Sequence, residues 1–170
     1  MKLYFIGADH EVTGSAHFIS ACGKNILVDY GMEQGVNVFE NAELPVAPSE
    51  IDYILVTHAH VDHTGMIPAL YKNGFKGEIY ATTATCELCD IMLRDSAHIQ
   101  EFEAEWKNRK NKRAGKEHFE PAYTMEDVEG VLSHFHKVSY NEDLTLCEGI
   151  IISFTDVGHL LGSSSIKIII

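Results

Sequence analysis

Four residues with metal-binding side chains lie within one short segment, His58-Ala59-His60-Val61-Asp62-His63. Imidazole nitrogens and carboxylate oxygens are both ligands that suit zinc. The segment directly follows the apolar run 53–56, which is typical of a buried strand. Side chains two apart on an extended backbone point to the same side, so His58 and His60 should face together. A turn after His60 would bring the last two side chains into a neighbouring position.

A catalytic zinc site uses three protein ligands and keeps a fourth position open, and His58 and His60 supply only two. The best third candidate is His159, which follows another apolar strand. It lies between Gly158 and Gly162, and glycines permit a close approach of the backbone. The sequence therefore predicts that three histidines from two distant segments meet at one metal ion.

The other histidines and the cysteines carry weaker signals. His134 and His136 form a second His-x-His pair, but they fall in a segment predicted to be helical, where side chains two apart diverge. We interpret that pair as surface residues. Cys86 and Cys89 form a Cys-x-x-Cys within a predicted helix, with no second cysteine pair nearby, so we expect helix packing rather than a redox or zinc-knuckle role. Four cysteines without an export signal also argue against a disulfide framework.

Strands and helices that would position these residues follow from the patterning of the chain. Strands are predicted at 2–7, 16–21, 25–29, 51–57, 78–81, 138–140, 144–147, 150–157 and 166–170. Short helices are predicted at 67–71 and at 128–135, the second after an N-cap at Thr124. This order predicts an α/β (α+β) fold with a mixed sheet and helices on its outer side.

A long helix is predicted from about Thr83, because apolar residues recur there at helical spacing. Its charged end, 101–116, should be a solvated extension. The apolar residues that define the spacing are Leu88, Ile91, Met92, Ala97, Ile99 and Phe102.

The net charge of −12 does not favour a nucleic-acid partner, since phosphate binders usually carry basic patches. However, six of the 13 basic residues gather in 107–116. They could contact RNA phosphates, although a solvated helix end is the favoured interpretation. No apolar run approaches the roughly 18 residues of a membrane span, and residues 1–7 lack the features of a secretory signal. We therefore expect a cytoplasmic protein without a membrane segment.

At these residues the sequence resembles the metallo-β-lactamase superfamily. Asp29 ends a strand as the first motif of that family does, the segment 58–63 matches the second motif, and His159 matches the third. More narrowly, the chain resembles the β-CASP branch of RNA-processing nucleases in the stretches 7–15, 27–32, 62–68, 79–82 and 158–163. The resemblance covers nearly the whole chain and implies the αββα sandwich of this superfamily.

The resemblance implies a zinc-dependent ribonuclease that uses two zinc ions on single-stranded RNA. His58, His60 and His159 would hold the first zinc, and Asp62 and His63 would contribute to the second. The bridging aspartate and last histidine of the family follow its third motif, and the β-CASP domain is a further insertion. We therefore expect residues 1–170 to be the N-terminal part of the domain, with one or two zinc ions and incomplete activity.

Two more roles follow from the resemblance. Asp29 would not bind metal but would orient the 58–63 segment through hydrogen bonds. Asp62 could orient a metal-bound water or accept its proton.

The predicted strand 166–170 would leave a free sheet edge, which favours pairing with a second copy of the chain.

Two alternatives remain open at this point. One is another hydrolase on the same fold that acts on a thioester or a lactam, against which the stretches 11–15 and 64–68 argue. The other is a non-catalytic module that keeps the fold for binding a partner. The sequence does not distinguish endonuclease from exonuclease action.

Overall fold

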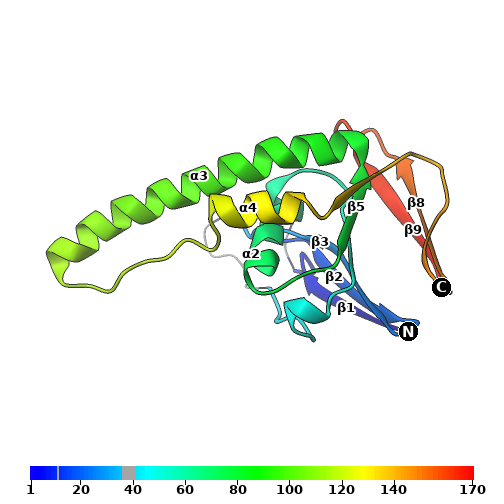
Figure 1. Cartoon of the computed structure of the whole chain (residues 1–170), viewed down its shortest axis with the longest axis horizontal. Coiled ribbons are helices and arrows are strands. Elements are labelled where there is room, and N and C mark those ends of the chain that lie inside the picture. Colours follow the sequence, from blue (N-terminus) through cyan, green and yellow to red (C-terminus); the bar gives the residue numbers. More distant parts are fainter. Residues whose placement is uncertain (11, 36–40) are drawn as a thin grey trace.

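The computed structural model describes residues 1–10, 12–35 and 41–170, so Glu11 and residues 36–40 lie outside the described part of the chain. The chain forms two sheets with helices packed on one side (Figure 1). The first sheet has six strands in the order β1-β2-β3-β4-β5-β6, and the second has three in the order β7-β8-β9. A mixed sheet with outer helices was predicted from the sequence and is confirmed.

The first sheet combines an antiparallel and a parallel half. Its strands are β1 (Lys2–Gly7), β2 (Ala16–Ala21), β3 (Lys24–Tyr30), β4 (Tyr53–Leu55), β5 (Glu78–Thr82) and β6 (Phe135–Val138). β1, β2 and β3 pair antiparallel, whereas β3, β4, β5 and β6 pair parallel. The carboxyl ends of β3, β4 and β5 therefore meet at one edge of the sheet.

The helices connect and cover the parallel half. They are α1 (Val61–Thr64), α2 (Ile67–Lys72), α3 (Thr83–Ala114) and α4 (Met125–Leu132), and a short 3-10 turn spans Pro48–Glu50. The second sheet consists of β7 (Leu144–Cys147), β8 (Ile150–Asp156) and β9 (Ser164–Ile169), all antiparallel.

Alternation along the parallel strands builds two separate apolar cores. Leu27 and Ile54 face the helices and pack in the larger core, whereas their neighbours Ile26 and Leu55 face the second sheet. Phe154 of β8 packs against the second pair. Because strand residues alternate between faces, a strand that is apolar at every position must be covered on both sides. The layers are therefore helices, six-stranded sheet and three-stranded sheet.

The long helix α3 extends beyond the rest of the fold (Figure 1). It begins at the N-cap Thr82 and ends at Gly115, which has a positive φ of 64°. Its buried face is made of small residues and Leu93, including Cys86 and Cys89, as expected for packing cysteines. The bulky residues Ile91 and Phe102, which helped to predict the helix, lie on its exposed side.

The predicted end of one helix was wrong, and with it the predicted start of the strand that follows. The helix expected at 128–135 ends at Leu132, and Phe135 begins strand β6. Phe135 continues the apolar spacing of the helix, but pairing with β5 takes precedence, and the backbone N–H of Ile79 donates to the carbonyl of His134 at 2.9 Å. The adjoining predicted strand, 138–140, correspondingly lies earlier, at Phe135–Val138.

Candidate metal centre

The carboxyl edge of the parallel strands gathers the polar residues that the sequence singled out. Asp29 lies at the end of β3, and the 57–63 segment follows β4. In sheets of this kind, ligands bind outside the carboxyl ends of the strands. The second sheet is joined to the same edge, because the backbone N–H and the hydroxyl of Ser164 both donate to the carbonyl oxygen of Thr57, at 2.9 and 3.0 Å. This connection places the β8–β9 loop, with His159, beside the 58–63 segment.

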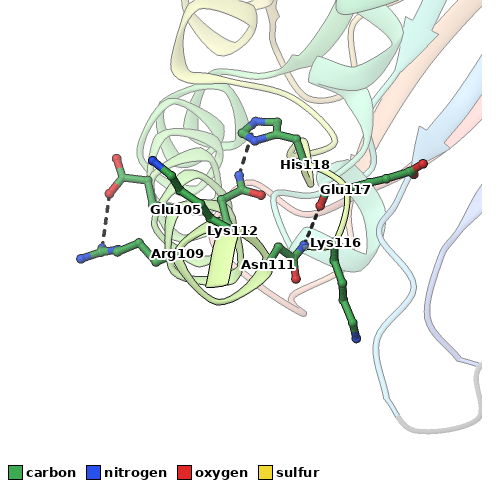
Figure 2. Close-up of a pocket in the computed structure, with 8 residues that line it drawn as sticks. Glu105, Arg109, Asn111, Lys112, Lys116, Glu117 and His118 are labelled. Carbon is green, nitrogen blue, oxygen red and sulfur yellow. Dashed lines mark hydrogen bonds and ion pairs between the residues drawn. The ribbon is translucent and has the colours of Figure 1, made fainter. Parts of the chain in front are cut away.

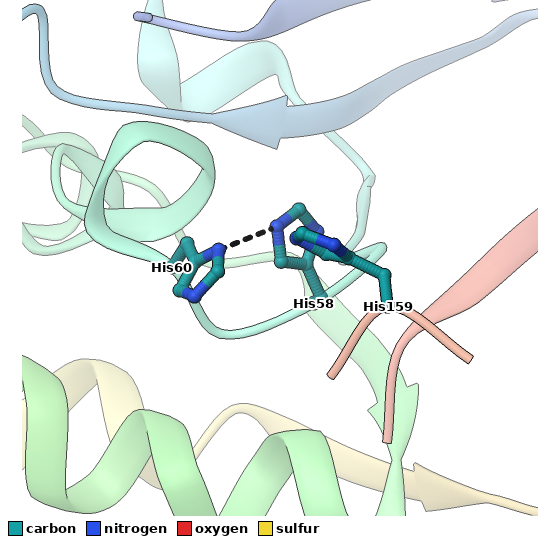
Figure 3. A group of neighbouring side chains, drawn as sticks. All are labelled: His58, His60 and His159. Atoms are coloured by element: carbon teal, nitrogen blue, oxygen red, sulfur yellow. Dashed lines mark hydrogen bonds between the residues drawn. The ribbon is translucent and has the colours of Figure 1, made fainter. Parts of the chain in front are cut away.

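Three imidazole rings converge there, as Figure 3 shows. One ligand nitrogen from each of His58, His60 and His159 lies within 4.8 Å of the other two. The ring centroids of His58 and His60 are 4.8 Å apart, and those of His159 lie 4.9 and 5.2 Å from them. The structure therefore brings together residues from two distant parts of the chain.

This arrangement fits a metal ion. The Nε2 atom of His58 lies 3.1 Å from Nδ1 of His60. Two imidazole nitrogens on a tetrahedral zinc, each at its usual bond length, would be about 3.3 Å apart. Burial and the neighbouring His63 lower the pKa of His58 to about 4, so its ring is neutral at pH 7, which is the form that binds metal. His58 is buried, whereas His159 is exposed, so the group has one side open to solvent.

The carboxylate of Asp29 contacts the 57–63 segment. Its carboxylate accepts hydrogen bonds from the backbone N–H of Thr57 at 2.8 Å and from the Thr57 hydroxyl at 2.7 Å. It also lies 2.8 Å from Nδ1 of His63. Asp29 is buried and has a φ of 57°, a left-handed conformation that aspartate tolerates better than most residues. Asp29 is not part of the group of three metal-binding side chains. Its contacts are those of a residue that orients the 57–63 segment.

Asp62 and His63 lie on the single turn of α1, next to the three imidazoles. The His63 ring centroid is 4.0 Å from that of His58. Since Nδ1 of His63 faces Asp29, its Nε2 atom is turned toward Asp62, at 3.7 Å from the carboxylate. Burial lowers the pKa of His63, but the hydrogen bond and charge of Asp29, with the charge of Asp62, outweigh it, so the pKa is raised overall. Within the described residues these two side chains form a pair, not a group of three ligands.

The loop that carries His159 is held by its own hydrogen bonds. The hydroxyl of Ser163 accepts from the backbone N–H groups of His159 and Leu160, at 3.1 and 3.0 Å. The carbonyl of Gly162 accepts from the hydroxyls of Thr82 and Thr85, at 2.6 and 2.9 Å. Gly162 has a φ of 87°, and a Cβ there would meet the backbone nitrogen of Thr85. Glycine is therefore required where this loop approaches the start of α3.

A cavity of about 590 Å³ borders this loop beside His159. Its wall includes Thr83, Tyr140, Leu160 and Leu161.

Sequence reasoning missed several residues that build the site. Thr57 and Ser164 supply the hydrogen bonds that join Asp29, the 58–63 segment and β9, yet single hydroxyl residues at strand ends are too common to stand out. Gly31 did leave a signal within the resemblance to the β-CASP branch. A Cβ at Gly31 would overlap the carbonyl of Asp62, which also accepts a hydrogen bond from the Ser15 backbone at 2.8 Å.

A family model described as a metallo-beta-lactamase superfamily domain matches residues 19–169, which is most of the chain. The chain belongs to the metallo-beta-lactamase superfamily.

Two curated relatives of this superfamily chain carry RNA-related names. It is 38% identical over 165 residues to "Ribonuclease TTHA0252" of Thermus thermophilus, an alignment that covers 96% of the chain and 34% of the relative. It is 27% identical over 167 residues to "Transcription termination factor FttA" of Methanocaldococcus jannaschii, covering 96% of the chain and 24% of the relative. The chain thus spans about a quarter to a third of the length of these relatives.

Solved structures show the same fold at low identity. The subclass B3 metallo-beta-lactamase MEM-A1 from a soil metagenome library superposes with a TM-score of 0.56 at 19% identity, covering 98% of the chain and 54% of that structure. The archaeal metallo-beta-lactamase superfamily protein ST1585 from Sulfolobus tokodaii gives 0.56 at 18% identity, covering 98% and 59%. Both comparisons establish the fold of this superfamily member.

The second histidine pair of this superfamily member is placed apart from the clustered imidazoles. Nδ1 of His134 lies 2.8 Å from the carbonyl of Gly77, and the ring of His136 stacks on Tyr80. Neither belongs to the group of three metal-binding side chains found in the described residues. His134 lies in the turn before β6 and His136 lies in β6, whereas the sequence predicted a helix for this segment.

The basic stretch lies at the far end of α3, where Figure 2 shows the residues that line a cavity of about 550 Å³. Arg109 pairs with Glu105 at 3.6 Å, and the side chain of Asn111 donates to the carbonyl of Glu117 at 2.8 Å. Two other cations lie over aromatic rings, Lys107 over Phe119 and Lys110 over Trp106. These contacts mix acidic, polar and aromatic partners with the basic ones, as in a solvated helix end.

No helix in the described part of the chain has both the length and the apolar character needed to cross a bilayer.

Proposed function

We propose that this chain is the metal-binding part of a zinc-dependent nuclease that hydrolyses RNA phosphodiesters, of the β-CASP branch. The observation that carries this proposal is the convergence of His58, His60 and His159 within 4.8 Å, in a superfamily member whose named relatives include a ribonuclease. These three residues would hold a first zinc ion. Asp62 and His63 would contribute to a second, whose remaining ligands would come from residues beyond those described.

The chemistry follows from the geometry of these side chains. Zinc held by His58, His60 and His159 would supply a coordinated water of lowered pKa, toward ~7, and positive charge to stabilise the phosphate. Asp62, beside the imidazoles and 3.7 Å from Nε2 of His63, would orient that water or accept its proton. The exposed side of the group, at His159, would admit the substrate. Asp29 would keep the 58–63 segment in place through its three contacts.

A phosphodiester is favoured over a thioester or a lactam by the relatives. The lactamase structure is 19% identical to the chain and supports only the fold, whereas the ribonuclease is 38% identical. The proposed substrate is single-stranded RNA, and the proposed location is the cytoplasm. Pairing of two copies through the edge strand β9 is a further prediction of the sequence. A non-catalytic role is less favoured, because one ring nitrogen from each of His58, His60 and His159 lies within 4.8 Å of the other two.

The deciding experiment uses the full-length protein that carries this chain, freed of metal and then loaded with zinc. It should cleave a fluorescent single-stranded RNA, and His60→Ala should lower the rate at least 100-fold, while His98→Ala, an exposed position on α3, should not. Cleavage at an undiminished rate in His60→Ala would overturn the proposal. Fast hydrolysis of a generic thioester or lactam, with intact RNA, would support the alternative hydrolase.

A further inference from the structure

Thr57, the residue directly before His58, lies at the centre of the hydrogen bonds beneath the clustered imidazoles. Its hydroxyl oxygen is 2.7 Å from Oδ2 of Asp29 and 3.0 Å from Nδ1 of His58. It is also 3.4 Å from Nδ1 of His63, at the limit of a hydrogen bond. The Thr57 side chain, which is not itself a metal-binding group, therefore contacts both the carboxylate of Asp29 and two imidazole rings.

The direction of these hydrogen bonds follows from which atoms carry protons. An ionised carboxylate only accepts hydrogen bonds, so the Thr57 hydroxyl donates its single proton to Asp29. The hydroxyl oxygen can then only accept. Consequently Nδ1 of His58 must be the donor in the contact at 3.0 Å. A neutral imidazole has one N–H, so Nε2 of His58 is left with a free lone pair.

That lone pair points to the place where a metal ion would lie. Nε2 of His58 is the atom that lies 3.1 Å from Nδ1 of His60. The opposite tautomer would carry its proton on Nε2 and could not bind a metal there. Metal-binding imidazoles are commonly held in one tautomer by a hydrogen bond on their other nitrogen.

We propose that Thr57 is a positioning residue that holds His58 in the Nδ1–H tautomer and so prepares its Nε2 atom for the metal ion. The inference rests on the metal site of the proposed function, but not on RNA being the substrate. The hydroxyl of Thr57 relays the orientation set by the buried carboxylate of Asp29 to the ring of His58.

The backbone of Thr57 is fixed on both sides, which makes the position of its hydroxyl definite. Its N–H donates to Oδ1 of Asp29 at 2.8 Å. Its carbonyl oxygen accepts from the N–H and the hydroxyl of Ser164, at 2.9 and 3.0 Å. Residues from β3 and β9 thus hold Thr57, so its hydroxyl reaches both Asp29 and His58 without any movement of the loop.

The test compares Thr57→Val, which keeps the shape but loses the hydroxyl, with Thr57→Ser, which keeps it. The matched control is Thr64→Val, because the hydroxyl of buried Thr64 donates to the carbonyls of Ala59 and His60 and to no imidazole nitrogen. Each protein is prepared without metal, and ring ¹⁵N chemical shifts report the tautomer of His58. Zinc affinity is then measured by competition with a chromophoric chelator.

Wild type, Thr57→Ser and Thr64→Val should show the Nδ1–H tautomer of His58 at neutral pH. Thr57→Val should show a mixture of tautomers and bind zinc about 10- to 100-fold more weakly. An unchanged tautomer and an affinity within twofold in Thr57→Val would overturn the inference. If that variant does not fold, the wild-type spectrum still decides, since a predominant Nε2–H tautomer there is incompatible with the proposal. RNA cleavage is measured separately, so an absence of cleavage would not change the conclusion about Thr57 and the tautomer of His58.

Discussion

The Nε2 atom of His58 lies 3.1 Å from the Nδ1 atom of His60, across the single intervening residue Ala59. Two nitrogens that face each other at this distance can share either one proton or one cation. Because His58 is buried and the neutral state of its ring is favoured, protons compete weakly for this position near neutral pH.

Removing one imidazole should abolish tight metal binding. The wild-type protein, first freed of metal, should take up at least one equivalent of zinc per chain. Zinc should then raise its unfolding temperature, because free zinc at 100 times Kd adds about 2.7 kcal/mol to the free energy of unfolding. His60→Ala should bind zinc at least 100-fold more weakly and lose this thermal shift. Isothermal titration calorimetry and a thermal melt measure both effects. The exposed residue His98 provides the control, since His98→Ala should behave as wild type.

Replacing Asp29 with asparagine should destabilise the fold even without metal. The variant keeps the shape and tolerates the positive φ of 57°, but its amide presents a donor to groups that now donate to a carboxylate. An unsatisfied buried donor costs about 1–3 kcal/mol, so the urea midpoint should fall accordingly. Asp90→Asn, at an exposed carboxylate on α3 that pairs with Arg94, should lower the midpoint only slightly, since a surface ion pair contributes about 0–1 kcal/mol. A midpoint for Asp29→Asn equal to that of wild type would show that these hydrogen bonds do not hold the segment.

The two glycines around His159 should respond differently to alanine. Both have a positive φ, 67° at Gly158 and 87° at Gly162, so both variants carry backbone strain of about 1–2 kcal/mol. Only the Cβ at Gly162 meets other atoms, those of Thr85 and Ala84. Gly162→Ala should therefore displace the loop and weaken zinc binding at least 10-fold, whereas Gly158→Ala should change the affinity less. Equal affinities in the two variants would argue that His159 reaches the metal without this packing.

The buried cysteines should resist alkylation in the folded protein. Burial raises the pKa of Cys86 to about 11, and burial raises that of Cys89 as well. A thiol of pKa 11 is roughly one part in a thousand thiolate at pH 8, and the thiolate is the reactive form. Mass spectrometry after brief iodoacetamide treatment should find the exposed Cys22 modified and this pair intact. Labelling of the pair should rise with pH and become complete in urea; rapid native labelling would contradict helix packing.

Much of the fold could be predicted because local pattern and tertiary environment agree along most of the chain. The run Tyr53-Ile54-Leu55 is apolar at successive positions, and the structure covers β4 on both faces. The exception is Phe135, whose spacing from Val128 and Val131 suits a helix. Its strand conformation depends on pairing with β5, a contact with a distant part of the chain that local periodicity does not contain.

The clustered imidazoles were foreseeable to different degrees. His58 and His60 are marked by their spacing alone, whereas His159 was singled out by its position after a strand and by the family resemblance. The hydrogen bonds that bring them together were not foreseeable, because they join Thr57 to Ser164 across two sheets. Their roles as zinc ligands remain predictions that the titrations above would test.

The joining of the two sheets at Thr57 and Ser164 has a consequence for folding. A cation shared by the 58–60 segment and the β8–β9 loop would act as a cross-link between the two layers. It would lie beside the two hydrogen bonds that connect Ser164 of β9 to Thr57 after β4. Loss of the cation should loosen β7, β8 and β9 before the six-stranded sheet, so their amide protons should exchange faster with deuterated solvent. The metal would then set the cooperativity of the domain as well as its chemistry.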